Sequence, residues 1–222
     1  MVNAQADRSP ARAREDYVKA IYQLGSSGPV RAAALARYLG VSRVSVSKAK
    51  RLLEADGLLD AAEAANEPLR LSRRGRRLAV AIVRRHRLLE TFLHGTLGVP
   101  IERVHAEAER MEHAISDDIA ERIAALLRRP QFDPHGHPIP YDDAPEGRAL
   151  PSLADVPVGR RARVVSLDDR DDDAVAALAA AGVLPGRTLC VEAKDGRSLT
   201  VRRGRHSVAL ARRHAAMVRV AT

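Results

Sequence analysis

Imidazoles and carboxylates recur at helical spacing in the middle of the chain. Between Ile101 and Arg129, a roughly 100° arc of a helix would carry two of each kind: His105, Glu109, Glu112 and His113. In the preceding stretch, His86 and Glu90 lie four residues apart and share a helix face as well. Imidazole nitrogen and carboxylate oxygen suit divalent metal ions. The spacing indicates a metal site; the alternative is an exposed lattice of salt bridges with the neighbouring arginines.

Other reactive side chains form weaker patterns. His135 and His137 lie in a proline-rich loop and are expected to be structural or exposed rather than ligands. Cys190 lies in a strand pattern and is expected to be buried. We find no His-Glu-x-x-His pattern, no glycine-rich phosphate loop and no nucleophile elbow. A metal-dependent hydrolase is therefore disfavoured, and we expect no enzymatic activity and no small organic substrate.

Two long helices must position the candidate ligands. Apolar periodicity predicts one helix over 76–93 and a second over 101–129, separated by HGTLGVP. The second helix carries an apolar stripe made of Val104, Ala108, Met111, Ile115, Ile119 and Ile123. Two helices alone bury little surface, so this helical domain, assigned to 76–140, is expected to pack on its neighbour and on a second copy of the chain. We therefore expect the protein to form a homodimer.

The N-terminal part has the pattern of a winged helix-turn-helix, assigned to 1–75. A helix is predicted over 16–24, a break at 25–29, and a short helix ending at Gly40. Ser42 is a good N-cap for a third helix that closes at Gly57. LLDAA and EPLRLS then read as two short strands around a polar turn, the wing.

The third helix has the composition of a DNA-reading helix. Its first turns are basic, contain small serines, and carry no acid before Glu54. The first residues of such a helix meet base edges, while Lys and Arg reach phosphates. The residues expected to contact DNA are Ser42, Arg43, Val44, Ser45, Lys48 and Arg51. The alternative is an ordinary basic, solvated helix face.

The C-terminal part changes character. A proline-rich linker is expected over 141–157, and 158–222 reads as five short strands interrupted by one helix, with a hairpin signal at Asp195-Gly196. A small SH3-like barrel fits this pattern. The fold class is therefore mainly α with a small β domain.

Bulk composition narrows the partners. The net charge is +9 and the pI about 10.5, which favours nucleic acid first and anionic membrane second. A single cysteine excludes an internal disulfide framework and a cysteine-rich zinc site. No apolar run approaches ~20 residues and the N-terminus has no apolar leader, so we expect a soluble cytoplasmic protein without a membrane partner.

The motifs together resemble one family over nearly the whole chain. EDYVKAIYQL, HRLLETFL, VHAEAERMEHAISDDIAERI and PHGHPIP are similar to segments of the diphtheria-toxin-repressor / manganese-transport-regulator family, in its three-domain form. His137 stands where Asn is common in that family. The resemblance implies a metal-dependent repressor of metal-uptake genes that binds an operator of imperfect palindromic sequence as a dimer. The remaining alternative is a DNA-binding regulator whose metal site is structural only.

The resemblance also implies which residues hold metal. The residues that match the family's primary, regulatory site are Asp16, Glu109, Glu112 and His113. His86, Glu90 and His105 match the helical ligands of a second site, and Asp171 matches a ligand that the SH3-like domain adds to it. Ala174 stands where a further ligand from that domain would fall.

Two departures bear on the metal. Iron-type members carry Met at the position of Asp16 and Cys at the position of Glu109, whereas this chain has carboxylates at both. Oxygen donors suit Mn²⁺, so Mn²⁺ is the expected cofactor and Fe²⁺ the second candidate. Compact manganese-type members carry Glu where this chain has Lys19, so we expect two separated sites rather than a closely spaced metal pair.

Overall fold

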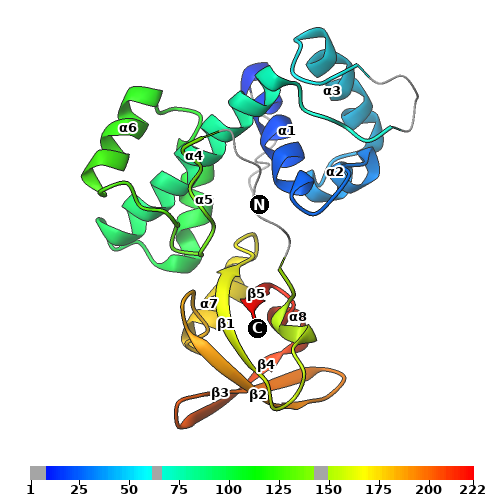
Figure 1. The fold of residues 1–222 in the computed structure, drawn as a ribbon. Helices are drawn as coiled ribbons and strands as arrows, with labels where there is room; N and C mark the ends of the chain where they lie inside the picture. The colour runs from blue at the N-terminus through cyan, green and yellow to red at the C-terminus, as the bar shows by residue number, and fades with distance from the viewer. Residues whose placement is uncertain (1–8, 62–66, 143–149) are drawn as a thin grey trace, which may run out of the picture. The chain divides into compact units, whose positions relative to one another are not determined.

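The computed structural model describes residues 9–61, 67–142 and 150–222. The chain divides into two compact units, Met1–Arg84 with Pro140–Ala149 (unit 1) and Arg85–Ile139 with Leu150–Thr222 (unit 2). Unit 1 is largely helical, and unit 2 combines helices with a five-stranded sheet (Figure 1). The predicted fold class, mainly α with a small β domain, is confirmed.

Unit 1 has the three short helices expected of a helix-turn-helix. They are α1 (Pro10–Gly25), α2 (Ala32–Leu39) and α3 (Arg43–Ala55). Gly40 adopts a φ of 65° and ends α2, while the Ser42 side chain accepts a hydrogen bond from the Ser45 amide and starts α3. The core draws on all three helices, on the bridged segment after them and on the next helix: Val18, Ile21, Leu35, Val46, Leu53, Leu59, Leu69, Ala79 and Val83.

The predicted wing is reduced to isolated bridges. Val30 pairs with Leu69 and Leu59 with Leu71, both antiparallel. The turn expected between the two wing strands includes 62–66, which lie outside the described residues. The long helix α4 (Arg73–Gly95) follows, and its residues fall in both units.

The second long helix of the sequence analysis is two helices. The structure has α5 (Ile101–Met111) and α6 (Asp117–Leu126), so the expectation of one helix over 101–129 was wrong. The Ser116 side chain accepts from the Ile119 amide and starts a new helix, and acidic residues in its first turn suit the helix dipole. The apolar stripe is therefore discontinuous: Val104 and Ala108 are buried, whereas Met111 and Ile119 are 37% and 44% exposed.

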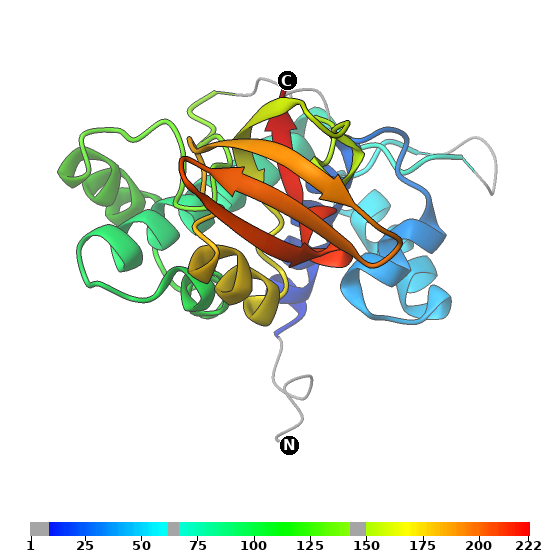
Figure 2. The same ribbon diagram turned by 90° about the horizontal axis from the view of Figure 1, so that it is seen from below.

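The β domain is a single antiparallel sheet in the order β4-β3-β2-β1-β5 (Figures 1 and 2). The strands are β1 (Arg161–Leu167), β2 (Thr188–Lys194), β3 (Ser198–Arg203), β4 (His206–Ala211) and β5 (Val218–Ala221). The remaining elements are the 3-10 turn η1 (Leu153–Asp155), α7 (Asp172–Ala180) and α8 (Arg212–Ala215). Alternate residues of β1 to β3 point into an aliphatic core that includes Val164, Leu189, Val191, Leu199 and Val201.

Part of the predicted linker belongs to this core. Leu153 and Val156, assigned by sequence to the linker 141–157, are buried in the β domain, and Ser152 bridges Arg219 of β5. Residues 143–149 of the same segment lie outside the described residues. Cys190 is half-buried rather than buried, because it alternates with the core residues Leu189 and Val191.

The β domain contacts the helical part of unit 2 through helix packing and through a backbone hydrogen bond, among other contacts. Helix α7 packs against α5, and Figure 2 shows the two helices next to each other. The amide of Leu167, at the end of β1, donates a 2.9 Å hydrogen bond to the His135 carbonyl in the loop after α6. This loop is closed by hydrogen bonds from the Asp133 amide to the His137 carbonyl and from the Gly136 amide to the Asp133 carbonyl. Among the described helices, none is long and apolar enough to cross a membrane.

We predict that Gly136→Ala is markedly destabilising. Gly136 has a φ of 88°, and an added Cβ would lie 2.0 Å from the Val165 carbonyl oxygen of β1. The matched control is Gly186→Ala, where φ is 83° but nothing lies within 4 Å of the added Cβ. The control should lose about 1–2 kcal/mol from backbone strain alone, and Gly136→Ala clearly more. Urea unfolding measures both, and equal losses would show that the loop does not depend on this close approach.

Candidate metal centre

The α4 donors are one helical turn apart and buried. His86 is 3% exposed and Glu90 is fully buried, and the His86 Nε2 lies 3.0 Å from the Glu90 Oε1. A helix places residues i and i+4 on one face, which is why this pair converges. A buried carboxylate needs a positive or hydrogen-bonding partner, because moving a charged group out of water without such a partner is energetically costly. Glu90 therefore defines the centre of the site.

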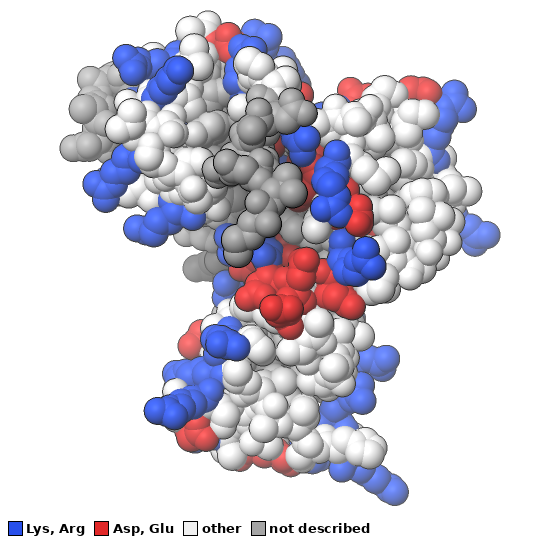
Figure 3. All heavy atoms as spheres, turned by 180° about the vertical axis from the view of Figure 1, so that it is seen from behind, with Lys and Arg blue, Asp and Glu red and all other residues white. Residues whose placement is uncertain are grey.

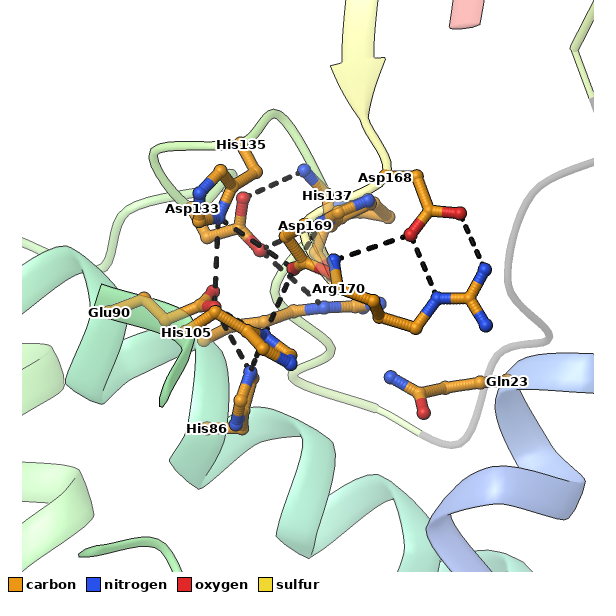
Figure 4. A network of polar contacts seen from close by, with 12 residues as sticks. Gln23, His86, Glu90, His105, Asp133, His135, His137, Asp168, Asp169 and Arg170 are labelled. Atoms are coloured by element: carbon orange, nitrogen blue, oxygen red, sulfur yellow. Dashed lines mark hydrogen bonds and ion pairs between the residues drawn. The ribbon is translucent and has the colours of Figure 1, made fainter. Parts of the chain in front are cut away.

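Two further candidate metal ligands, one from α5 and one from the β domain, lie near Glu90. His105 Nδ1 lies 3.2 Å from Glu90 Oε1 and 3.1 Å from His86 Nε2. Asp169, two residues beyond β1, places its Oδ2 3.4 Å from His105 Nδ1. Ligand atoms of His86, Glu90, His105 and Asp169 all lie within 4.8 Å of one another. Figure 4 shows these four side chains converging from three segments of the chain.

The loop after α6 adds a second set of donors around the same carboxylate. His135, which is fully buried, places its Nδ1 3.6 Å from Glu90 Oε1 and 3.7 Å from Asp169 Oδ2. His137 Nδ1 lies 3.3 Å from Asp133 Oδ2 and 3.5 Å from Asp169 Oδ2. Glu90, Asp133 and His135 form a compact group of ligand atoms in their own right. The two groups share Glu90 (Figure 4).

The buried polar atoms of this cluster fit a cation. Glu90 Oε2, Asp133 Oδ2 and His135 Nδ1 are buried without a hydrogen-bond partner. His135 Nε2 lies 3.0 Å from the Ile101 carbonyl, to which it donates, so in the neutral ring the lone pair is on Nδ1 and faces the carboxylates. Asp133 Oδ2 and His135 Nδ1 have ion-pair contacts at 3.3 and 3.6 Å but no hydrogen bond. Buried polar atoms are nearly always hydrogen-bonded, so three such ligand atoms in one place point to a bound ion. A divalent cation would compensate all three.

The pKa values of the clustered side chains are shifted by burial and by the opposite charges of their neighbours. Burial lowers the pKa of His105, but Asp169 and Glu90 outweigh it and raise the pKa to about 11. Burial also lowers the pKa of His137, and Asp133 and Asp169 raise it to about 9. Burial raises the pKa of Glu90 and of Asp169, yet the surrounding imidazoles hold both pKa values well below the usual range. The metal-free cluster is thus a set of imidazolium–carboxylate pairs.

The predicted primary-site residues of unit 2 lie next to this cluster. Glu112 is fully buried, with Oε1 3.3 Å from His113 Nε2 and Oε2 2.5 Å from His86 Nδ1. Glu109 is 39% exposed at its side chain and lies 4.0 Å from His86 Nδ1. Asp16 lies on α1 in unit 1, so its place in the primary site stays a prediction.

Asp169 replaces Asp171 as the β-domain member of the cluster. The Asp171 side chain accepts from the Ala174 amide and caps α7, which fills the role that a first-turn aspartate has in any helix. Asp171, Asp172 and Asp173 are exposed. On the face drawn in Figure 3, Asp and Glu form one dense group and several smaller ones, and Lys and Arg are spread over much of the surface. Asp169, two positions earlier, is the β-domain carboxylate that lies in the cluster, and a ligand role for Asp171 stays a prediction.

The loop after α6 places two histidines beside the cluster that the sequence pattern did not assign to it. His135 and His137 were expected to be structural or exposed, yet His135 is fully buried and both contact carboxylates of the cluster. The available signal was the spacing Asp-Pro-His-Gly-His, in which two imidazoles and a carboxylate fall within five residues. That signal was weak, because nothing in it predicts a partner such as Glu90.

The candidate DNA-contacting surface lies on α3 in unit 1. All six predicted residues are exposed: Ser42, Arg43, Val44, Ser45, Lys48 and Arg51. Val44 is 78% exposed, whereas Val46 and Leu53 of the same helix are buried in the core of unit 1. One side of α3 is thus anchored by packing, and the other side presents a basic and partly apolar surface to solvent.

Family models match three successive regions of the chain. The family model described as the iron dependent repressor N-terminal DNA binding domain matches residues 11–64. The iron dependent repressor metal binding and dimerisation domain matches 72–141, and the FeoA domain matches 152–222.

Relatives with known functions match over most of the chain. The iron-dependent repressor IdeR of Mycobacterium tuberculosis is 37% identical over 202 residues, covering 84% of this chain and 86% of that protein. The diphtheria toxin repressor of Corynebacterium glutamicum is 34% identical over 203 residues, covering 86% and 88%. A solved manganese-dependent transcriptional repressor in complex with manganese superposes with a TM-score of 0.82 at 34% identity, covering 93% of this chain and 98% of that one.

These matches agree with the order of the parts described above: a helix-turn-helix unit, helices that carry a buried imidazole–carboxylate cluster, and a small antiparallel sheet. The chain belongs to the diphtheria-toxin-repressor family of iron- and manganese-dependent transcriptional repressors.

Proposed function

We propose that this protein is a DNA-binding repressor of metal-uptake genes, activated by Mn²⁺ and, as the second candidate, by Fe²⁺. The observation that carries the proposal is the buried cluster around Glu90, where three ligand atoms have no hydrogen bond, within the region matched by a metal-binding domain. A cluster of this kind is costly without a cation. We expect it to act in the cytoplasm, where its DNA target is.

The donor set favours Mn²⁺. The described cluster offers imidazole nitrogens and carboxylate oxygens, and the sole cysteine, Cys190, lies in β2 of the β domain and not in the cluster. Hard oxygen donors suit Mn²⁺, whereas sulfur would favour softer metals. The predicted primary site has the same character, because Asp16, Glu109 and Glu112 supply carboxylates and His113 an imidazole.

The primary site is proposed to be the regulatory one. Asp16 belongs to the DNA-binding unit, whereas Glu109, Glu112 and His113 belong to unit 2. Without a cation, three carboxylates in one pocket repel each other; with one, coordination ties the two units together. The ion can activate only if it binds the DNA-competent arrangement more tightly, and DNA must then tighten metal binding by the same factor.

DNA recognition is proposed to use the exposed side of α3. Arg43, Lys48 and Arg51 would contact phosphates, and the exposed Val44 suits contact with a thymine methyl group. A homodimer would present two such helices to an imperfect palindrome, with half-sites about one DNA turn apart. Exposed apolar side chains in the region matched by the dimerisation domain, among them Ile119 and Leu126, supply a surface for that dimer.

The regulatory role of Asp16 can be tested by substitution. In fluorescence anisotropy with an operator duplex selected from random DNA in the presence of Mn²⁺, the unmodified protein should bind about 5–150-fold more tightly with Mn²⁺ than with chelator. Asp16→Ala should lose most of this stimulation. The control Asp60→Ala changes an exposed aspartate of the same unit and should keep it. Equal Mn²⁺ stimulation in all three proteins would overturn the regulatory role of Asp16, whereas an unmodified protein that Mn²⁺ does not stimulate would have only a structural metal site.

Metal preference should follow the donor atoms. The unmodified protein should respond to Mn²⁺ at least as well as to Fe²⁺ under anaerobic conditions. Replacing Asp16 by Met and Glu109 by Cys together introduces sulfur, so the response should shift toward Fe²⁺, Co²⁺ or Ni²⁺. The same anisotropy titration measures both proteins. A protein that ignores Mn²⁺ but responds to Fe²⁺ before any substitution would contradict the carboxylate argument.

Metal binding at the cluster should release protons. With pKa values of about 11 and 9, His105 and His137 are protonated at pH 7, and a nitrogen must lose its proton before it can coordinate. Because raised pKa values favour the protonated form, Mn²⁺ affinity should increase as pH rises from about 6 to 9. Calorimetry in two buffers of different ionisation enthalpy counts the protons. His105→Ala should release fewer, and an affinity independent of pH would refute this account.

A further inference from the structure

One imidazole stands between the two predicted metal sites. His86 on α4 is almost wholly buried, and its two ring nitrogens face opposite sets of side chains. Nε2 lies 3.0 Å from Glu90 and 3.1 Å from His105, which belong to the second site. Nδ1 lies 2.5 Å from Glu112 Oε2 and 4.0 Å from Glu109 Oε1, which belong to the predicted primary site.

The two carboxylate oxygens of Glu112 likewise face different partners. Its Oε2 contacts His86, and its Oε1 lies 3.3 Å from His113 Nε2. Glu112 itself is fully buried, so protein groups, these two histidines among them, orient it rather than water. His113, Glu112, His86 and Glu90 thus form a continuous alternation of imidazole and carboxylate that runs from one site into the other.

We infer that His86 is a positioning residue for the primary site and couples the two metal sites through Glu112. The inference rests on the proposed function. A histidine that binds a metal through one nitrogen characteristically donates its other N–H to a carboxylate, which fixes the ring and its tautomer. A cation bound at Nε2 would hold the proton on Nδ1, directed at Glu112 Oε2.

As a consequence, the Glu112 side chain is held in the orientation that the primary site needs. With one oxygen of Glu112 held by His86, the other oxygen stays beside His113, where the primary cation is proposed to bind. Holding the side chain before the cation arrives removes part of the ordering cost of binding. Filling the second site therefore tightens the primary site, and by reciprocity filling the primary site tightens the second.

The competing reading is that His86 serves the second site only. Two substitutions separate the readings, because the Asn amide nitrogen lies near the position of Nδ1 and the longer Gln amide reaches the position of Nε2. His86→Asn keeps a donor for Glu112 and loses the second-site ligand. His86→Gln keeps a polar atom for the second site and loses the contact with Glu112.

The test measures Mn²⁺ binding without DNA. In a Glu90→Gln/Asp169→Asn background, which disables both donor groups of the second site, free Mn²⁺ is followed by electron paramagnetic resonance. One Mn²⁺ should remain bound, at the primary site. Adding His86→Gln should weaken it about 10–100-fold, the usual loss when an outer partner of a metal ligand is removed, whereas adding His86→Asn should weaken it less than about threefold.

Each outcome decides between the readings. Equal primary-site affinities in the background, Asn and Gln proteins would overturn the positioning role of His86. A background protein that binds no Mn²⁺ would overturn the proposed primary site and the coupling with it. In the unmodified chain, primary-site affinity should be about tenfold higher than in the background, since a filled second site fixes the ring; an unchanged affinity would refute the coupling alone.

A measurement on the unmodified chain avoids the risk that a variant misfolds. With diamagnetic Cd²⁺ bound and ¹⁵N-labelled histidine, the His86 resonances should show a protonated Nδ1 and a metal-bound Nε2. A metal-bound Nδ1, or a proton on Nε2 with both sites filled, would contradict the inference.

Discussion

A carboxylate buried out of reach of water must be matched by positive charge, and Glu90 imposes that requirement on unit 2. It is fully buried, and His86, His105 and His135 surround it at 3.0, 3.2 and 3.6 Å. An unpaired buried charge is strongly unfavourable, and removal of one partner from a buried ion pair costs about 3–5 kcal/mol. The helices, the loop after α6 and the end of β1 have to meet where this charge is satisfied.

The cluster therefore has a structural as well as a chemical consequence. Asp169 comes from the β domain and His105 from α5, so the electrostatic attraction between them reinforces the packing of α7 against α5. A cation coordinated by both would connect the β domain to the helices by bonds to one atom. In the proposed function, the FeoA-type domain would thus supply a metal ligand of its own.

The break between α5 and α6 also serves the site. Glu112 lies just after α5, where the chain leaves regular helix, and Ser116 starts the next helix four residues later. Helical apolar spacing alone favours one long helix, but a serine followed by two aspartates is a strong helix start. The capping signal at Ser116 therefore determines the helix boundary, which the apolar spacing alone does not predict.

The elements and the i, i+4 donor pairs follow from the sequence by itself. Ser42 and Gly40 bound their helices as expected, the strands of the β domain lie where alternation predicts, and helical geometry alone brings His86 to Glu90. Periodicity and capping are local, so they can be read from a single chain. The choice of Asp169 over Asp171, and the burial of His135, were decided only by tertiary structure. Both need segments that are distant in the sequence to meet, as in the hydrogen bond from the Leu167 amide to the His135 carbonyl, which joins residues 32 positions apart and has no local signature.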